Sequence, residues 1–537
     1  MKNIAFTVLV ILLVSIFLGC IGKEQPEPAQ KTGGKEMDME KGMDMDKVQK
    51  INSLYRGIAG LDKAKTSQII ELSEGSVLQL EAKPVIKNIN GNSIRMYSYN
   101  GQIPGPMIKV KQGSNISVNF TNDLDIETTV HWHGIRLENK FDGVPDITQK
   151  AIKPGESFLY RLYFPDEGIY WYHTHIRDDI GQELGLYGNI LVEPGSRNYF
   201  NPVDKEVVLF LDDIKIVNSD VEPFDKDQAR FALTGRFGDI MLANGETDYQ
   251  LNVKKGEAVR FYLTSSSNTR PFNFSIGEHK LKLVGGDSGK YEKESFVDSV
   301  VLGVSERYIV EVLFDKPGTF KLLHNIPVDY AAAKRTYVLG TVSVSENPSV
   351  SQKPGFFVLK ENNDIIDGIK PFKKYISAKP DYEIDLTVDV MGDLAKEIAS
   401  MPKEMVPIEW DEDENMVMMN SMSTSENVKW ILKDKDTGKE NPEYQMKVGD
   451  VKKITIFNDP DSMHPMQHPM HLHGQRFLVL AQDGKPYDNL VWKDTVLVPA
   501  GSRIDILVEF TNPGKWLMHC HIPEHAEAGM IASFTVS

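Results

Sequence analysis

The sequence predicts an all-β protein built from three β-sandwich domains in series. Beyond residue 55, short runs of Val, Ile, Phe and Tyr alternate with polar residues and are separated by Gly, Pro and Asn, a pattern typical of strands. Two strand–turn layouts each occur three times, roughly 150 residues apart, which is the size of a domain and not of a solenoid repeat. A chain of 537 residues is also too long for one hydrophobic core, because such cores stop growing near ~250–300 residues.

The two repeated layouts define the domains. The first is a glycine turn followed by an alternating strand, as in "VKQGSNISVNFTND", and it occurs at 110–123, 253–266 and 447–459. The second is a strand, a glycine turn and a strand that ends near a histidine, and it occurs at 152–175, 301–325 and 497–521. We therefore expect sandwich domains at 56–195, 196–345 and 376–537, with a linker at 346–375.

The first twenty residues, "MKNIAFTVLVILLVSIFLGC", have the features of a signal peptide. Lys2 precedes an apolar run from Ile4 to Leu18, which is short for a membrane span. The ending "FLGC" resembles the lipobox of prokaryotic lipoproteins, which implies a lipidated Cys20. The alternative is an uncleaved membrane anchor. In both cases the protein is exported, lies in the cell envelope, and meets the membrane only through this end.

Residues 21–55 predict a disordered tether, because they are rich in Lys, Glu, Pro and Gly. Its methionines either bind soft Cu(I) or belong to a plain polar spacer; they are Met37, Met39, Met43 and Met45. The net charge of the whole chain is −16, which argues against nucleic acid as a partner. We expect a monomer.

Ten of the 13 histidines fall into four clusters. The clusters are "HWHG" with His131 and His133, "YHTH" with His173 and His175, "HPMHLHG" with His468, His471 and His473, and "HCHIPEH" with His519, His521 and His525. They occupy matching places in repeats one and three. Repeat two has "FNFS" at 272–275 and a lone His324 instead, so we expect no catalytic metal there. We treat His324, His279 and His464 as ordinary histidines.

The His-x-His spacing indicates metal binding. Alternate side chains on a strand share one face and lie ~6.6 Å apart, so each pair presents two imidazoles to the same side. Four pairs offer eight nitrogen ligands, which suit several copper or zinc ions. In "HCH" the cysteine points the other way and serves a second site.

That second site has a ligand set typical of blue copper. Cys520 is followed by His525 and Met530, and His468 lies three residues before His471. Two histidines, a cysteine and a distant methionine form an electron-transfer copper site. Zinc is a weaker alternative, because it gains nothing from an axial methionine. The backbone joins Cys520 directly to two ligands of the histidine cluster.

These four motifs together resemble those of the multicopper oxidases, the laccase and cuprous-oxidase family, over roughly residues 75–537. The resemblance implies three cupredoxin domains, four coppers per chain, and reduction of dioxygen to water. By position it places type 1 copper on His468, Cys520, His525 and Met530, type 2 copper on His131 and His471, and the two type 3 coppers on His133, His173 and His521 and on His175, His473 and His519. It also makes Asp142 a candidate proton relay, with a plain turn aspartate as the alternative. Ala526 stands where several bacterial relatives have a glutamate, so part of the usual proton path is absent.

The electron donor is less well defined by the sequence. An axial Met530 favours easily oxidised donors, such as Cu(I) or phenols. Methionines concentrate at 401–422 and 463–470, beside acidic residues at 411–414, and either capture Cu(I) or pack a core, with Met416, Met418 and Met419 on the first strand of the third domain. We expect electrons to enter through an exposed edge of a type 1 histidine.

Two other classes of protein remain as alternatives. A copper-binding or electron-transfer protein without oxidase turnover would not need the complete histidine cluster. A two-domain copper nitrite reductase lacks the "HCH" pair.

Overall fold

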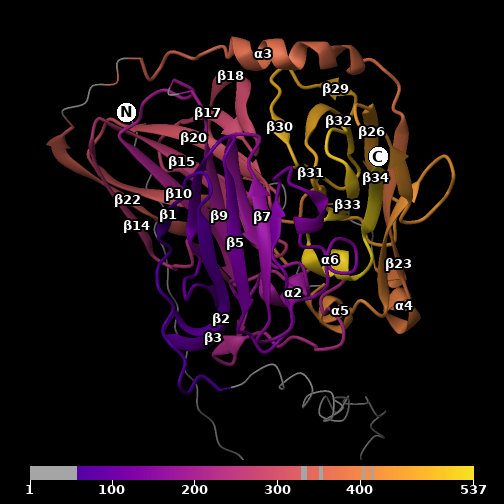
Figure 1. Cartoon of the computed structure of the whole chain (residues 1–537). Helices are drawn as coiled ribbons and strands as arrows, with labels where there is room; N and C mark the ends of the chain where they lie inside the picture. The colour runs from indigo at the N-terminus through magenta and orange to yellow at the C-terminus, as the bar shows by residue number, and fades with distance from the viewer. Residues whose placement is uncertain are drawn as a thin grey trace, which may run out of the picture. The chain divides into compact units, whose positions relative to one another are not determined.

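The computed structural model describes residues 57–196, 198–327, 335–349, 353, 355–401, 406–412 and 416–537. The expected signal peptide, Cys20 and the tether lie outside these residues. The described chain consists mainly of strands in six large sheets and one two-stranded ribbon (Figure 1), which confirms the all-β prediction. Within the described residues, no helix has both the length and the hydropathy that crossing a membrane requires.

Repeat one contains two sheets, with strand orders β3-β2-β5-β7 and β1-β4-β9-β8-β6. Its strands are β1 (Ile69–Glu71), β2 (Val77–Ile89), β3 (Asn92–Tyr99), β4 (Met107–Lys111), β5 (Asn115–Asn122), β6 (His131–His133), β7 (Ser157–Tyr163), β8 (Gly168–His173) and β9 (Tyr187–Glu193). Two short helices follow the histidine motifs, η2 (Asn139–Phe141) and α2 (Asp178–Gly181).

Repeat two has the orders β13-β10-β15-β20-β17-β18 and β14-β22-β21-β16-β19. Its strands are β10 (Lys205–Ile214), β13 (Ile240–Ala243), β14 (Tyr249–Lys255), β15 (Glu257–Ser265), β16 (Phe272–Ile276), β17 (Leu281–Gly286), β18 (Gly289–Val297), β19 (Val300–Leu302), β20 (Arg307–Phe314), β21 (Gly318–Asn325) and β22 (Thr336–Pro348). A separate ribbon joins β11 (Ile216–Val217) to β12 (Asp220–Val221).

Repeat three has the orders β24-β23-β26-β32-β28-β29, with β30 also on β28, and β25-β34-β33-β27-β31. Its strands are β23 (Tyr382–Val390), β24 (Val428–Asp434), β25 (Glu443–Met446), β26 (Val451–Asn458), β27 (His468–Leu472), β28 (Phe477–Gln482), β29 (Lys485–Pro486), β30 (Trp492–Lys493), β31 (Thr495–Val498), β32 (Arg503–Glu509), β33 (Gly514–Cys520) and β34 (Ile531–Val536). Its helices are α4 (Gly392–Ser400), α5 (Val417–Met422) and α6 (Pro523–Glu527).

The three repeats share one topology. The strand after the first glycine turn is β5, β15 or β26, and each pairs in parallel with β2, β10 or β23 and antiparallel with β7, β20 or β32. The turn glycines Gly113, Gly256 and Gly449 have φ of 82°, 86° and 93°, a left-handed conformation that favours glycine. Each repeat also has a strand that leads to the second histidine motif or to its equivalent, namely β8, β21 or β33. In every repeat this strand lies in the sheet that does not contain β5, β15 or β26.

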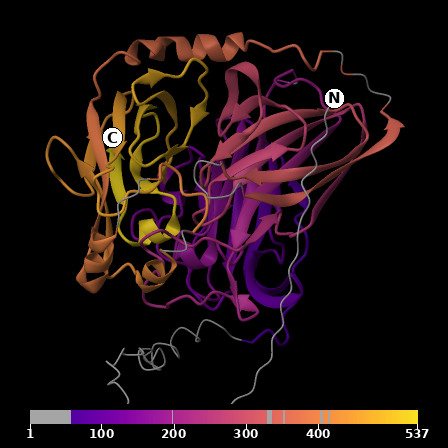
Figure 2. The same ribbon diagram turned by 180° about the vertical axis from the view of Figure 1, so that it is seen from behind.

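The stretch 346–375 is not a bare linker. It contains the end of β22, the helix α3 (Asn363–Ile369) and the 3-10 helix η4 (Lys370–Tyr375). In both views the part of this segment around α3 lies along the top of the drawing (Figures 1 and 2). Ile369 is fully buried and packs with Leu478, Leu480 and Trp492, so the segment is held against repeat three.

Candidate metal centre

The first two histidine pairs lie side by side in one sheet. Strand β6 carries His131 and His133, and its register with β8 sets His131 opposite His173. His175 follows just after β8. The ring centroids are 5.7 Å apart in the first pair and 6.3 Å in the second. Both pairs therefore present their rings to one side, as the spacing predicts.

Repeat three reproduces this arrangement with β27 and β33. Their register sets His471 opposite His519 and Met470 opposite Cys520. His473 and His521 follow just beyond the two strands, and their rings lie 4.8 Å from His471 and 5.4 Å from His519, respectively. The "HLH" and "HCH" motifs thus form a second matching layer of imidazoles.

The two layers meet in one buried cluster of eight histidines. The ring of His133 stacks on that of His471 with centroids 3.6 Å apart, and His131 lies 4.1 Å from His473. Potential ligand atoms of His175, His473 and His519 lie within 4.8 Å of one another, as do those of His131, His133 and His173 and those of His131, His471 and His473. His521 completes the cluster, with ring centroids 5.0 Å from both His133 and His173.

The hydrogen bonds of the cluster leave ring nitrogens free inside it. The Nδ1 atoms of His131 and His471 donate to the main-chain oxygens of Asp142 and Asp494, both over 2.8 Å. Their Nε2 atoms are buried and have no hydrogen-bond partner among the described residues, and the same holds for ring nitrogens of His133, His173, His175 and His521. Buried polar atoms are nearly always paired, so facing nitrogens without partners indicate metal ligands.

Asp142 contacts two of these histidines. Its Oδ2 accepts from Nδ1 of His473 over 2.9 Å, and its Oδ1 lies 3.3 Å from Nδ1 of His131. The side chain is almost fully buried at the end of η2. Asp142 therefore bridges histidines of repeats one and three and is more than a turn residue.

Two residues of this site were missed by the sequence reasoning. The Nε2 of His133 lies 3.0 Å from both Asp494 Oδ1 and Thr495 Oγ1, and Thr495 Oγ1 lies 3.2 Å from Nδ1 of His471. Both residues belong to "WKDTV", which carries no cluster of ligand types. Its only signal is an aspartate between buried strands.

Burial keeps seven histidines of the cluster neutral. Desolvation, with added repulsion between neighbouring rings, lowers the pKa well below the usual value for His133, His173, His175, His471, His473 and His521. Burial lowers the pKa of His519 to about 4. Neutral imidazoles keep a lone pair for a metal ion, so the rings are ready to bind copper.

The second site is compact and separate from the cluster. The Nδ1 atoms of His468 and His525 lie 3.5 Å and 3.7 Å from Cys520 Sγ and 3.3 Å from each other. All three side chains are completely buried. Met530 is also fully buried in the same core, and its main-chain oxygen accepts from the amide of Cys520 over 3.2 Å. Burial raises the pKa of the Cys520 thiol, so a metal must displace its proton.

The expectation of an exposed histidine edge at this site is wrong. His468 and His525 have no exposed surface, because the ring of Trp430 stacks on His525 at 4.3 Å and meets His468 edge-on at 4.7 Å. The Nε1 of Trp430 donates to Ala232, which belongs to a loop of repeat two that packs into the same core. Sequence patterns did not place this loop over the site.

The end of the methionine segment forms the helix α5 (Val417–Met422), and the first strand of the third domain is β23. Met419 of α5 is buried in the core that contains Cys520 and Met530, whereas Met418 and Met422 are 65% and 45% exposed. Met405 lies outside the described residues. Of the acidic run, Asp411 is paired with Arg270 and Glu412 with Lys215.

In repeat two, phenylalanine stands at the position that matches the first histidine motif. In the register of β16 with β21, Phe274 lies opposite His324, where repeats one and three have two histidines. His324 is buried, and its Nδ1 accepts from the amide of Asn273 over 3.0 Å. Burial lowers its pKa to about 3, so it is a neutral core residue.

A buried glutamate lies close to Ala526, the position where several relatives have a glutamate. Glu524 is completely buried and accepts from Asn268 Nδ2 over 3.1 Å. Burial raises its pKa to about 8. It precedes His525 on α6, so the chain keeps a buried carboxyl group close to position 526.

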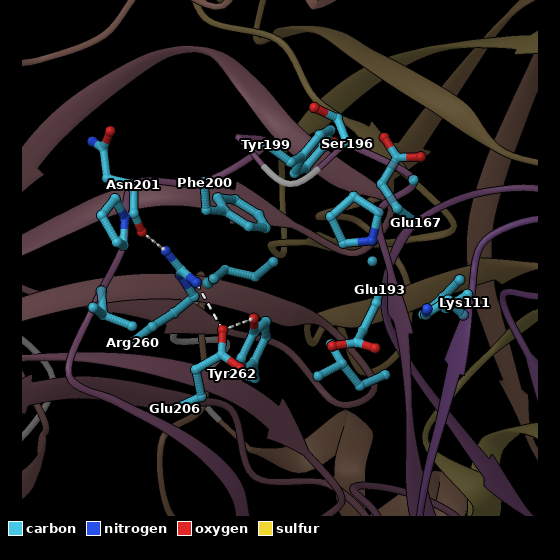
Figure 3. A pocket seen from close by; sticks show the side chains of 18 of the residues that line it. Lys111, Glu167, Glu193, Ser196, Tyr199, Phe200, Asn201, Glu206, Arg260 and Tyr262 are labelled. Carbon is cyan, nitrogen blue, oxygen red and sulfur yellow. Dashed lines mark hydrogen bonds and ion pairs between the residues drawn. The ribbon is translucent and has the colours of Figure 1, made fainter. Parts of the chain in front are cut away.

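None of the residues that line one cavity of the described chain belongs to the two candidate metal sites. It has a volume of about 700 Å³ and lies between repeats one and two, with Glu167, Glu193, Tyr199 and Phe200 in its wall (Figure 3). None of the described residues that line it is His, Cys or Met. Its Arg260 already pairs with Glu206 over 2.8 Å.

Comparison with known proteins agrees with this geometry. Models of multicopper oxidase domains match residues 82–197, 213–347 and 408–537. Multicopper oxidase MmcO of Mycobacterium tuberculosis is 27% identical over 483 residues, which cover 84% of this chain and 85% of that protein. Multicopper oxidase mco of Staphylococcus aureus is 26% identical over 456 residues, which cover 83% of this chain and 85% of that protein.

Solved structures share the fold. A Campylobacter jejuni multicopper oxidase, described as a metallo-oxidase, has a TM-score of 0.65 at 23% identity and covers 90% of this chain and 99% of its own. A laccase-like multicopper oxidase, CueO, of Ochrobactrum sp. has a TM-score of 0.68 at 20% identity and covers 88% of this chain and 100% of its own.

The chain belongs to the multicopper oxidase family. It is a copper-dependent oxidase that uses dioxygen as electron acceptor and small molecules or ions as donors.

Proposed function

We propose that the protein holds four coppers per chain and oxidises Cu(I), with phenols as further donors, in copper homeostasis at the cell envelope. The observation that carries the copper sites is the convergence of unpartnered, neutral ring nitrogens at one place and of Cys520, His468 and His525 at another. Bound copper would supply one-electron transfer and the reduction of dioxygen. Attachment to the membrane through Cys20 is proposed from the sequence alone.

The proposed ligand sets are those that the resemblance implies, and the clustering of the same histidines supports them. Type 1 copper would take His468, Cys520, His525 and Met530, type 2 copper His131 and His471, and type 3 coppers His133, His173 and His521 and His175, His473 and His519. The peptide bonds of Cys520 lead to His519 and His521, so one short covalent path joins the two sites. A copper-storage protein would not need this path.

Asp142 is proposed as a proton relay beside the cluster. Its Oδ2 holds Nδ1 of His473, while its buried Oδ1 has no hydrogen-bond partner among the described residues. This oxygen keeps an acceptor site for an incoming proton. Glu524 is not assigned this role, because its described side-chain contacts are with Asn268 and Arg236 and not with a histidine of the cluster.

Copper analysis tests the assignment of sites. Wild-type protein should contain four coppers per chain and show the intense thiolate-to-copper absorption of a blue site. Cys520→Ser should abolish this band and donor oxidation and retain three coppers, because the cluster histidines are unchanged. A variant that keeps the band would show that Cys520 is not the thiolate ligand.

The donor is proposed from α5. This helix presents Met418 and Met422 to solvent and places Met419 in the core around Cys520 and Met530. Thioethers bind Cu(I), so the exposed methionines can capture the ion above the buried type 1 site. The sealed histidines give a phenol no direct contact with a ligand ring. The metallo-oxidase description of the Campylobacter jejuni structure supports the same donor class.

The matching test compares two donors. Met418→Leu with Met422→Leu should raise the KM for Cu(I) several-fold and leave the KM for a phenol unchanged, measured by oxygen uptake. Met391→Leu is the matched control, because Met391 is 49% exposed and lies outside both methionine-rich segments. An unchanged KM for Cu(I) in the double variant would remove α5 from donor binding.

A further inference from the structure

A buried ion pair lies beside the histidine cluster, where the repeats meet. Arg307 begins β20 in repeat two, and Asp494 lies between β30 and β31 in repeat three. The Nη1 and Nη2 atoms of Arg307 donate to Oδ1 and Oδ2 of Asp494 over 2.6 Å and 2.5 Å. Both side chains have no exposed surface. A bidentate fork of this kind fixes the plane of the carboxylate as well as its position.

Arg307 also binds repeat one. Its Nε donates to the main-chain oxygen of Ile169 on β8 over 2.9 Å, and its guanidinium carbon lies 5.7 Å from the ring centroid of Tyr170 on the same strand. Its own amide donates to Asp287 over 2.9 Å. Its Nη1 also donates to the main-chain oxygen of Ser305 over 3.1 Å, so one guanidinium group contacts all three repeats. Strand β8 is the strand that ends at His173.

Asp494 in turn contacts two histidines of the cluster. Its Oδ1 accepts from Nε2 of His133, and its main-chain oxygen accepts from Nδ1 of His471. Since His133 is neutral, a proton on Nε2 leaves the lone pair on Nδ1, which is buried and has no partner among the described residues. His471 has the opposite tautomer: its Nδ1 carries the proton, and its Nε2 has no hydrogen-bond partner among the described residues.

A glycine without a side chain lies directly against this ion pair. Gly134, the glycine of "HWHG", has a φ of 83°, and a Cβ at this position would overlap Oδ2 of Asp494 and lie 3.0 Å from Nη2 of Arg307. No other residue type fits beside the fork without displacing it. The motif glycine and the ion pair thus form one packed unit.

We propose that Arg307, from the repeat that binds no copper, is a positioning residue of the proposed trinuclear copper site, acting through Asp494 to fix His133 with Nδ1 as its ligand atom and His471 with Nε2. This inference rests on the proposed function. It gives repeat two a part in oxygen reduction beyond that of a spacer.

Arg307→Lys is the informative variant. It keeps the buried positive charge next to Asp494 but loses the planar fork and the bond to Ile169. We expect about 10- to 100-fold weaker retention of the trinuclear coppers in a chelator competition. The electron paramagnetic resonance hyperfine splitting of type 2 copper should shift, and the blue absorption of the type 1 site should stay unchanged.

Arg260→Lys is the matched control. Arg260 lies on β15 in the same sheet, is nearly buried, and binds Glu311 over 2.6 Å and Glu206 over 2.8 Å. Its hydrogen bonds and ion pairs with the described residues include none with a histidine. This variant should retain all coppers and the wild-type spectrum. Equal copper loss in both variants would assign the effect to general destabilisation and overturn the proposal, as would an Arg307→Lys variant with wild-type affinity and hyperfine splitting.

The same experiment separates the two proposals. If wild-type protein fails to bind the three cluster coppers, the proposed function falls, and this inference with it. If wild-type protein binds four coppers and Arg307→Lys matches Arg260→Lys, only the role of Arg307 is wrong.

Discussion

Replacement of Gly134 by alanine tests how tightly the cluster depends on its surroundings. The added methyl group meets Asp494 Oδ2, which is bound to Arg307, while the same carboxylate holds His133 through Oδ1. Either the carboxylate or β6 must move. Gly113→Ala is a matched control, because Gly113 has a φ of 82° and a Cβ there would meet no atom within 4 Å.

The magnitude follows from two contributions. A left-handed conformation costs an alanine about 1–2 kcal/mol, and both variants share this cost. Gly134→Ala must in addition break or distort one charged hydrogen bond, which costs about 1.5–3 kcal/mol. We therefore expect the unfolding free energy to fall by about 1–2 kcal/mol in Gly113→Ala and by about 3–5 kcal/mol in Gly134→Ala.

The assay is urea unfolding of both copper-free variants, with copper content measured on the loaded proteins. Gly134→Ala should lose type 2 and type 3 copper and keep the blue absorption, because the proposed type 1 ligands Cys520, His468 and His525 are not among the atoms nearest to the added methyl group. Gly113→Ala should keep all coppers. Equal destabilisation with full copper content in both variants would refute the packed unit of Gly134, Asp494 and Arg307.

Two further predictions concern histidines. His324→Ala should leave copper content and turnover unchanged but lower the unfolding free energy by about 1–3 kcal/mol, because the buried amide of Asn273 loses its hydrogen-bond acceptor. His173→Ala should instead lose type 3 copper. Loss of copper in His324→Ala would disprove a metal-free repeat two. Copper-free protein should lose stability as pH falls from about 6.5 to 4. Burial lowers the pKa of His468 to about 3 and that of His519 to about 4, so only the unfolded chain takes up these protons in that window. Protonation of these two histidines in the unfolded chain should lower the unfolding free energy by about 3 kcal/mol for each pH unit below 6.5. Urea midpoints that do not change between pH 6.5 and 4 would contradict the neutral, buried state of both rings.

The fold and the histidine ligand candidates were accessible from the sequence because their signals are local. Glycine turns such as Gly113 and alternating strands repeat three times, and a spacing of two residues sets the direction of two rings on a strand. The equivalence of Phe274 with His131 and His471 also follows from these repeats. Register then brings the pairs together without further information.

The surroundings of the site were not accessible, because they depend on contacts between distant segments. Arg307, Asp494 and Trp430 are separated by tens to hundreds of positions, and no motif links them. The methionine run at 416–422 was ambiguous, because a short apolar run fits a strand or a helix equally well. The exposed histidine edge was wrong because a loop of repeat two, with Ala232, covers the site.

The central claim is that a copper ion held by Cys520 would collect electrons one at a time, and that the copper ions held by the histidine cluster would use them to reduce dioxygen fully to water. The most direct test is the ratio of donor oxidised to dioxygen consumed, measured with a one-electron donor in a sealed oxygen electrode with a peroxide assay. The structure predicts four donor molecules per dioxygen and no free hydrogen peroxide. A ratio of two with accumulating peroxide would contradict a cluster in which the eight histidines act as one site.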